Sequence, residues 1–311
     1  MKFGCTLWPV RRSPPYEAAI ERIAKLGFKG VELITRDRKT LDEYFTRKKN
    51  RELREFMESL EIELTGFNFP ILGVTSLKQE DRDAALSNFK RQVEVASELD
   101  AKVITGSPRW PYEPWGIPRP NAWQRPLMQT FGVEQRNIPY DQDFDVIWKS
   151  YVSLVRKFAD VVEDVGYRYA IETHAFEIAC NADGLLRLLE QVDSKAVGAN
   201  FDTAYMFAQP ELITVAILKL KNRIFHVHLD DNDGCTPLHW RPGRGKIDWF
   251  SVLKALKAVG YDYVLALEML HLPGVSRSGV RDDASLDYDL ELVKAMTFLR
   301  SVAKEAGVKI E

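Results

Sequence analysis

The sequence predicts a closed barrel of alternating parallel strands and helices, and three observations support this fold class. Short apolar segments with strand character alternate with amphipathic helical segments along nearly the whole chain, which favours a parallel sheet with helical crossovers. Eight strand-then-helix units can be counted, and eight is the number that closes a (β/α)8 TIM barrel. The first strand-to-helix turn, residues 8–13, lacks the glycine-rich phosphate-binding pattern of the alternative, an open doubly wound sheet.

The predicted elements follow one another in a regular order. The strands are expected at residues 2–8, 31–35, 62–67, 101–105, 168–173, 196–201, 223–229 and 263–267. The helices are expected at residues 16–26, 41–60, 80–99, 144–165, 182–191, 210–220, 249–259 and 285–306. Residues 1–311 are therefore predicted to form a single α/β barrel domain with a long insert, residues 106–143, after the fourth strand.

Composition limits the classes of function. The chain has 311 residues, is 45% hydrophobic and carries a formal net charge of −2 without a polybasic stretch, so we expect no nucleic-acid partner. No apolar stretch has the length of a bilayer span and the start does not resemble a signal peptide, so we expect no membrane attachment. The three cysteines are widely spaced and odd in number, which favours free thiols in a reducing cytoplasm.

The seventh predicted strand ends in two histidines. His226 and His228 are two residues apart, so they share one face of the strand, and the apolar residues between and around them indicate that both faces are covered. Buried imidazoles need partners. For one histidine alone, the simplest interpretation is a core side chain that is bonded to a carbonyl or a carboxylate.

Four successive predicted strands end in side chains of the types that can bind a metal ion. Because the carboxyl ends of barrel strands meet at one rim, we expect these side chains to be neighbours: Glu172, Asp202, His228 and Glu268. Three carboxylates in an apolar mouth would repel one another unless a cation lies between them, so the pattern predicts one divalent ion such as Mn, Mg, Co, Zn or Fe. The alternative is that each acid separately caps a helix or pairs with an arginine.

Several motifs carry a resemblance across nearly the whole chain. They are Gly30-Val31-Glu32-Leu33, Glu172, Asn200-Phe201-Asp202-Thr203, His226-Val227-His228, Pro242-Gly243-Arg244-Gly245-Lys246-Ile247-Asp248-Trp249, Gly260-Tyr261-Asp262 and Glu268. With these motifs the chain resembles the xylose isomerase-like TIM barrel superfamily, which includes sugar phosphate isomerases and epimerases, and in particular its ketose 3-epimerase branch. The resemblance implies that Glu172, Asp202, His228 and Glu268 bind one divalent ion, and that Glu172 and Glu268 also shuttle the proton.

The resemblance implies a carbohydrate isomerase or epimerase, and chemistry leaves the outcome open. A metal acting as a Lewis acid would stabilise the enediolate formed when a base removes the proton next to a ketose carbonyl. Return of the proton to the opposite face is epimerisation, return to the neighbouring carbon is isomerisation, and loss of a β-substituent would make the protein a lyase or dehydratase of a keto-sugar or keto-inositol. A sugar-binding barrel without catalysis is a further alternative. A three-zinc nuclease of the same fold is disfavoured, because the chain has 5 histidines and two of them, His239 and His271, are expected in loops.

Candidate substrate contacts surround the predicted metal site. Tyr205 stands where many family epimerases carry a histidine, and His174, two residues past Glu172, could replace that imidazole or be a core histidine. Trp8 could form an apolar wall or belong to the core, and Arg244 could reach the substrate or lie in a solvated loop. Trp115 in the insert could stack on a sugar ring, while a packed lid or a dimer contact is the alternative. The expected partner is a small carbohydrate, and the resemblance suggests a homo-oligomer.

Overall fold

Eight parallel strands close into a barrel in the computed structural model, which describes residues 1–107, 110, 141–175, 177–270 and 287–311. The strands are β1 (Lys2–Thr6), β2 (Gly30–Ile34), β3 (Glu63–Asn68), β4 (Val103–Gly106), β5 (Arg168–Glu172), β6 (Val197–Asp202), β7 (Ile224–Leu229) and β8 (Val264–Leu267). Each strand pairs with the next one in the sequence, and β1 pairs with β8, with Phe3 opposite Leu265. The predicted fold class is confirmed.

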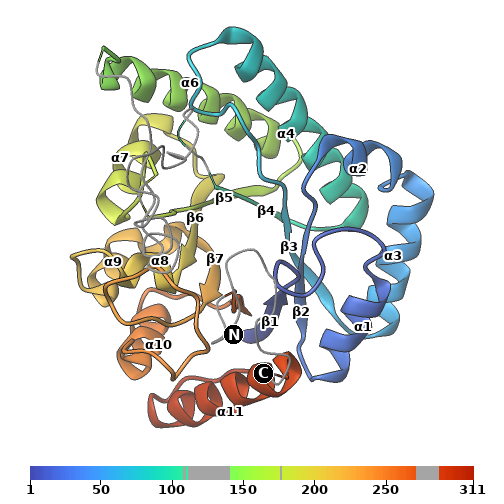
Figure 1. Ribbon diagram of the computed structural model, residues 1–311, viewed down its shortest axis with the longest axis vertical. Coiled ribbons are helices and arrows are strands. Elements are labelled where there is room, and N and C mark those ends of the chain that lie inside the picture. The colour runs from blue at the N-terminus through green and yellow to red at the C-terminus, as the bar shows by residue number, and fades with distance from the viewer. Residues whose placement is uncertain (108–109, 111–140, 176, 271–286) are drawn as a thin grey trace, which may run out of the picture.

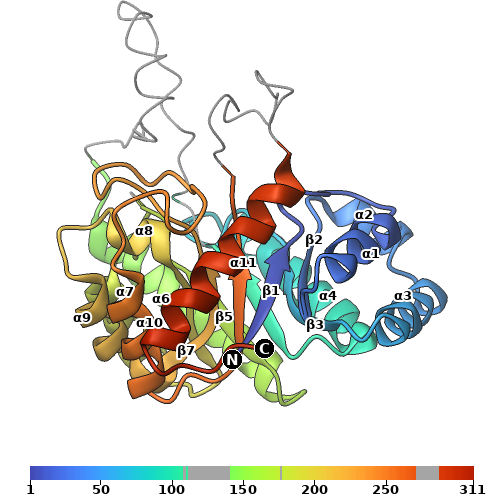
Figure 2. The same cartoon turned by 90° about the horizontal axis from the view of Figure 1, so that it is seen from below.

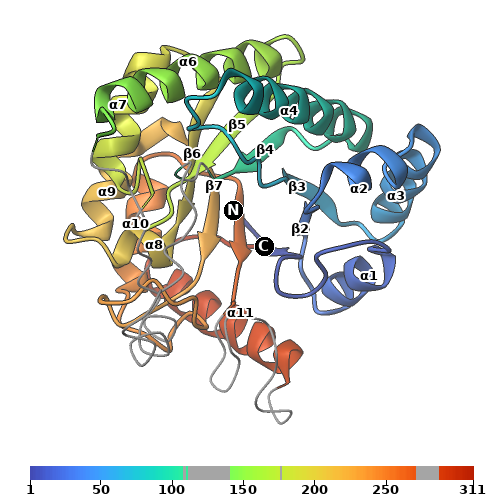
Figure 3. The same ribbon diagram turned by 45° about the horizontal axis from the view of Figure 1, so that its top comes forward.

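Helices form a ring outside the strands (Figure 1; Figure 3). They are α1 (Glu17–Lys25), α2 (Arg38–Glu43), α3 (Arg47–Ser59), α4 (Gln79–Leu99), α6 (Phe144–Glu163), α7 (Ala182–Val192), α8 (Thr203–Phe207), α9 (Ile213–Leu220), α10 (Trp249–Ala258) and α11 (Tyr288–Glu305), with a 3-10 turn at Lys221–Arg223. None of the helices in the described residues is both long enough and apolar enough to cross a membrane.

Two helix predictions differ from the structure because polar side chains cap helices there. The helix expected at 41–60 is two helices, since the hydroxyl of Thr46 accepts a bond from the backbone N–H of Lys49 at 3.3 Å and starts α3 anew. The short helix α8 was not expected. It begins directly after β6, where Asp202 Oδ1 accepts from the backbone N–H of Tyr205 at 2.7 Å.

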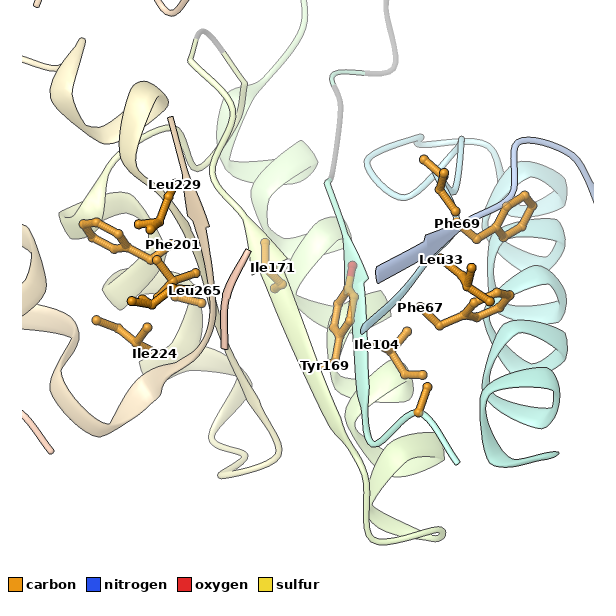
Figure 4. Close-up of a cluster of buried hydrophobic side chains, with 14 of the residues drawn as sticks. Leu33, Phe67, Phe69, Ile104, Tyr169, Ile171, Phe201, Ile224, Leu229 and Leu265 are labelled. Carbon is orange, nitrogen blue, oxygen red and sulfur yellow. The ribbon is translucent and has the colours of Figure 1, made fainter. Parts of the chain in front are cut away.

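The apolar core lies largely between the strands and the surrounding helices, as the side chains drawn around the sheet in Figure 4 show. Phe89 of α4 and Phe158 of α6 stack with ring centroids 4.0 Å apart, and Tyr169 of β5 meets the edge of Phe89 at 5.0 Å. These aromatic contacts fix two helices to the sheet, so the strand ends that carry the site are held on a rigid frame.

The two ends of the barrel differ. The chain termini lie together at the amino-terminal end of the strands, where the backbone N–H of Glu311 donates to the carbonyl of Met1 at 3.0 Å (Figure 2). The segments that follow β6 and β7 gather at the opposite end (Figure 2). Of the predicted insert, residues 108–109 and 111–140 lie outside the described residues, and so does Trp115.

Candidate active site and metal centre

Four strand ends bring together the side chains that the sequence predicted as metal ligands. Glu172 ends β5, Asp202 ends β6, His228 lies in β7 and Glu268 directly follows β8. The register places Asp202 opposite His228, and the backbone N–H of Glu268 donates to the carbonyl of Leu229 at 3.2 Å. All four side chains are buried. The barrel rim therefore assembles them in one place, as expected.

The distances among these four side chains fit a single divalent ion. His228 Nδ1 lies 2.7 Å from Glu172 Oε1, 3.2 Å from Glu268 Oε2 and 3.9 Å from Asp202 Oδ2. One ligand atom from each residue lies within 4.8 Å of the others. Three carboxylate oxygens and one imidazole nitrogen form a donor set that Mn, Co, Zn or Fe can use.

Glu32, in the middle of β2, orients the histidine of this set. Its Oε2 accepts a bond from His228 Nε2 at 2.8 Å, and its Oε1 accepts from the hydroxyl of Thr105. A proton held on Nε2 by Glu32 would leave the lone pair of Nδ1 available to a metal ion bound between the three carboxylates, as in metal-binding histidines with a carboxylate partner. The sequence analysis included Glu32 only in a family motif and assigned it no function.

Burial and charge act together on the ionisable groups of the site. Burial alone would raise the pKa of Glu172, but His174 and His228 lower it well below its usual range. Burial alone would lower the pKa of His228, but Glu268 and Glu32 raise it well above its usual value. Burial raises the pKa of Glu268. The site thus concentrates negative charge around one imidazole away from water.

His226, two residues before His228, has a different environment. Its Nδ1 lies 3.1 Å from Asn200 Oδ1, and burial lowers its pKa to about 4. This amide-bonded imidazole lies in the barrel interior, with its ring centroid 5.2 Å from that of His228.

His174 and Tyr205 lie beside the predicted ligands. His174 Nε2 is 2.6 Å from Glu172 Oε2, and the rings of His174 and Tyr205 stack with centroids 4.3 Å apart. Tyr205, which stands at the position of the family histidine, is therefore in contact with His174, the residue predicted to replace that imidazole, and His174 is bonded to Glu172.

Trp8 and Arg244 are less closely tied to the centre. Trp8 is half-buried after β1, with the guanidinium of Arg12 4.5 Å from its ring centroid. Its backbone N–H donates to the hydroxyl of Thr6 at 3.3 Å, and that hydroxyl lies 3.5 Å from Glu268 Oε1. The side chain of Arg244 is exposed, and its backbone N–H donates to the carbonyl of Arg241 at 3.0 Å. The roles of Trp8 and Arg244 in binding substrate stay predictions.

Asp230 and His239 are buried site residues that the sequence analysis missed. His239 Nε2 lies 3.2 Å from Asp202 Oδ2 and 3.3 Å from Asp230 Oδ2. Burial alone would lower the pKa of His239, but Asp230 and Asp202 raise it to about 10. His239 is in a loop, as predicted. Because that loop folds back to the rim, His239 still lies at the site. The acidic sequence 230–233 was the one signal that could have pointed to this region.

The structure is an eight-stranded parallel barrel whose carboxyl-terminal rim carries buried carboxylates and imidazoles. It therefore falls into the class of α/β barrels with a polar rim that could bind a metal ion. Residues 20–302 match the family model described as "Xylose isomerase-like TIM barrel". The chain belongs to this family.

Known proteins resemble the chain over most of its length. An uncharacterized protein of Methanocaldococcus jannaschii is 24% identical over 94% of this chain and 90% of its own length. D-psicose 3-epimerase of Ruminiclostridium cellulolyticum is 24% identical over 86% of this chain and 83% of its own length. The solved structure of D-psicose 3-epimerase with D-tagatose from Clostridium cellulolyticum H10 superposes with a TM-score of 0.74 at 22% identity, covering 97% of this chain and 99% of that one.

Proposed function

We propose that this protein is a divalent-metal-dependent carbohydrate epimerase or isomerase that removes and returns a proton next to the carbonyl of a ketose. The observation that carries the proposal is the convergence of Glu172, Glu268 and Asp202 around His228 Nδ1. One ligand atom from each of these four residues lies within 4.8 Å of the others. The relationship to D-psicose 3-epimerase, a sugar epimerase, supports the same chemistry.

The cofactor in this proposal is one divalent ion, Mn, Mg, Co or Zn, held by Glu172, Asp202, His228 and Glu268. When bound, the ion would act as a Lewis acid that stabilises negative charge on the carbonyl oxygen of the substrate. Glu32 supports the site by accepting a hydrogen bond from His228 Nε2, which would leave Nδ1 free to bind the ion.

Glu172 and Glu268 are the proposed acid–base pair. Both carboxylates contact the same imidazole nitrogen, with Glu172 Oε1 at 2.7 Å and Glu268 Oε2 at 3.2 Å, while they come from strands on either side of β6 and β7. A sugar between them would present one face to each carboxylate. One group would remove the proton and the other would return it, which is epimerisation through an enediolate.

Other polar and aromatic groups are proposed to hold the sugar. His174, bonded to Glu172 and stacked on Tyr205, supplies an imidazole at the rim. Trp8 would bound the pocket on the β1 side, and Trp115 and Arg244 would contact the substrate from the surrounding loops. A small carbohydrate is thus the proposed partner.

The proposal places the enzyme in the cytoplasm and allows for a homo-oligomer. Cys5, Cys180 and Cys235, all within the described residues, form no disulfide, which supports a reducing compartment. Size-exclusion chromatography with light scattering would measure the oligomeric state.

The experiment that tests the proposal is solvent-isotope exchange. Metal-loaded protein is incubated in D2O with D-psicose and a panel of ketoses and keto-glycosides, and NMR follows both products and deuterium. Epimerisation or isomerisation requires deuterium on the carbon next to the carbonyl, and a β-elimination product would instead assign a lyase. The Glu268→Gln variant should lose exchange, whereas Glu305→Gln, an exposed change on α11, should keep it. Absence of exchange on every substrate would refute the proposal.

A further inference from the structure

Two arginines lie beside Trp8 at the mouth of the barrel. Trp8 follows β1 and Arg36 follows β2, so both stand beyond the carboxyl-terminal ends of neighbouring parallel strands. The guanidinium carbon of Arg12 lies 4.5 Å from the centroid of the Trp8 ring, and that of Arg36 lies 5.8 Å from it. One indole therefore brings two positive charges together at the rim that carries the proposed metal ligands.

The side chain of Arg12 is tied down at one nitrogen and open at the others. Its Nε donates to the carbonyl of Trp8 at 2.7 Å, and the side chain is half-buried. Within the described part of the chain, its two terminal amino groups have no hydrogen-bond or ion-pair partner. The planar fork of N–H donors at the end of Arg12 is thus left for another acceptor.

Arg36 has no ion-pair partner among the described residues either, although an acid follows it in the sequence. The carboxylate of Asp37 is taken up by α2, because its Oδ1 accepts from the backbone N–H of Thr40 at 2.7 Å and its Oδ2 accepts from the hydroxyl of Thr40 at 3.0 Å. The side chain of Arg36 is exposed, so its guanidinium is open to a ligand that enters the mouth of the barrel.

This arrangement differs from that of other arginines in the protein. Several of them pair with an acid at 2.7 Å to 2.9 Å, as in Arg22–Asp289, Arg38–Asp42 and Arg241–Glu291. Beside Trp8, by contrast, two like charges act on each other, since burial and the charge of Arg36 lower the pKa of Arg12 while the charge of Glu268 raises it. An anion between the two guanidinium groups would relieve their repulsion.

Trp8 also connects the arginines to the proposed metal site. Its backbone N–H donates to the hydroxyl of Thr6 at 3.3 Å, and that hydroxyl lies 3.5 Å from Glu268 Oε1. A sugar bound at the metal site would therefore extend toward the arginines along the β1 side of the mouth. The buried carboxylates of the site would repel an anionic sugar, and two guanidinium groups at this edge would offset that repulsion.

We propose that Arg12 and Arg36 bind an anionic group of the sugar substrate, a phosphate or a carboxylate, beside the indole of Trp8. The inference rests on the proposed function, because it names the class of substrate for the same site, a ketose that carries a negative charge away from its carbonyl. A planar guanidinium matches two oxygens of either group with two parallel N–H bonds. Trp8 would pack against the carbon chain between the charged group and the carbonyl.

Equilibrium dialysis of the metal-loaded full chain tests the proposal with two matched pairs of ligands. The pairs are D-ribulose 5-phosphate with D-ribulose, and D-tagaturonate with D-tagatose. We expect the anionic member of at least one pair to bind about 10–100-fold more tightly than its neutral partner, because hydrogen bonds between charged groups are strong. The pair with the larger ratio of Kd values assigns the group as a phosphate or a carboxylate. Raising the ionic strength should weaken the binding of the anionic sugar and leave that of the neutral one unchanged.

Arginine variants assign this preference to the two side chains. Arg12→Gln and Arg36→Gln should each bring the Kd values of the anionic and the neutral sugar closer together. Arg11→Gln is the matched control, because it removes the same charge from the same segment, while Arg11 donates to the carbonyls of Ser13 and Pro14 at 2.7 Å and 2.8 Å. This control should keep the wild-type ratio.

Two results would overturn the inference. One is equal Kd values within both pairs, or no binding of either anionic sugar, in the wild type. The other is a preference for the anionic sugar that persists in Arg12→Gln and Arg36→Gln, since the metal ion would then account for it. If Arg12→Gln fails to fold, which circular dichroism will show, Arg12→Lys replaces it. That variant keeps the charge but removes the planar fork, so its ratio should fall, and an unchanged ratio would count against the proposal.

Deuterium exchange separates this inference from the proposed function. Exchange on a neutral ketose without any preference for charge would overturn the anion site and leave the proposed function intact. Binding of an anionic ketose that depends on Arg12 and Arg36, without exchange on any substrate, would support the anion site and refute the proposed catalysis.

Discussion

The Glu32→Gln substitution tests whether the carboxylate of Glu32 orients His228 for metal binding, while it leaves His228 itself in place. Glu32 is buried, its Oε2 accepts from His228 Nε2 at 2.8 Å, and it makes no other contribution to the ligand set around His228 Nδ1. Glutamine keeps the shape but removes the charge, and its amide can present either a donor or an acceptor to the imidazole. Loss of such a partner weakens metal binding about 10–100-fold, or about 1.4–2.8 kcal/mol.

Isothermal titration of Mn²⁺ into chelator-treated protein measures this effect. Glu63→Gln is the matched control, because Glu63 lies on the adjacent strand β3 and pairs with Lys2 at the outer surface. We expect the control to bind Mn²⁺ as the wild type does. Equal affinity for Mn²⁺ in Glu32→Gln and the wild type would refute the argument that Glu32 fixes which nitrogen of His228 carries the proton. An equal loss of Mn²⁺ affinity in Glu32→Gln and Glu63→Gln would attribute the effect to a general disturbance of the sheet.

Three further predictions concern catalysis, metal and core. Glu268→Gln should reduce deuterium exchange by about 10²–10⁴-fold, because it removes one member of the acid–base pair, and NMR rates within about threefold of the wild type would contradict this role. Mn²⁺ at about 100 times its Kd should stabilise the fold by about 2.7 kcal/mol, and a calorimetric Tm that is unchanged by metal would contradict a folded-state site. Phe158→Ala should lower the free energy of unfolding by about 3–5 kcal/mol through loss of the stack on Phe89. Phe250→Ala, at a 40% exposed residue, should change it by about 0.5 kcal/mol in urea unfolding, and equal losses in the two variants would contradict the packing argument.

The fold and the grouping of the four proposed metal ligands were readable from the sequence, because both follow from local pattern. Strand and helix periodicity gave the order of the elements, and a barrel places all strand ends at one rim. Glu172, Asp202, His228 and Glu268 each stand at or next to a strand end, so no knowledge of loops was needed to bring them together.

The residues that sequence reasoning missed depend on contacts between distant segments. Glu32 lies in mid-strand among apolar neighbours, and only closure of the barrel brings β2 across the interior to β7, 196 positions away in the chain. His239 follows β7 by a loop whose path depends on the bridge between Asp231 and Trp240. Neither contact has a periodic signature in the sequence.

His226 and His228 show how a short displacement along one strand changes the surroundings of a side chain. They share a face and differ by two residues, or about 6.6 Å along the strand. The register with β6 places Asn200 opposite His226 and Asp202 opposite His228. His226 Nδ1 lies 3.1 Å from the amide oxygen of Asn200, whereas His228 Nδ1 lies 2.7 Å from Glu172 Oε1 and 3.2 Å from Glu268 Oε2, with the amide nitrogen of Asn200 3.3 Å from its Nε2. That register includes an irregularity between Ala199 and Asn200, which shifts the pairing within β6 and which no pattern of apolar residues encodes. The surroundings of each histidine are therefore set by the neighbouring strands, and an argument from β7 alone could not have distinguished a core histidine from a proposed ligand.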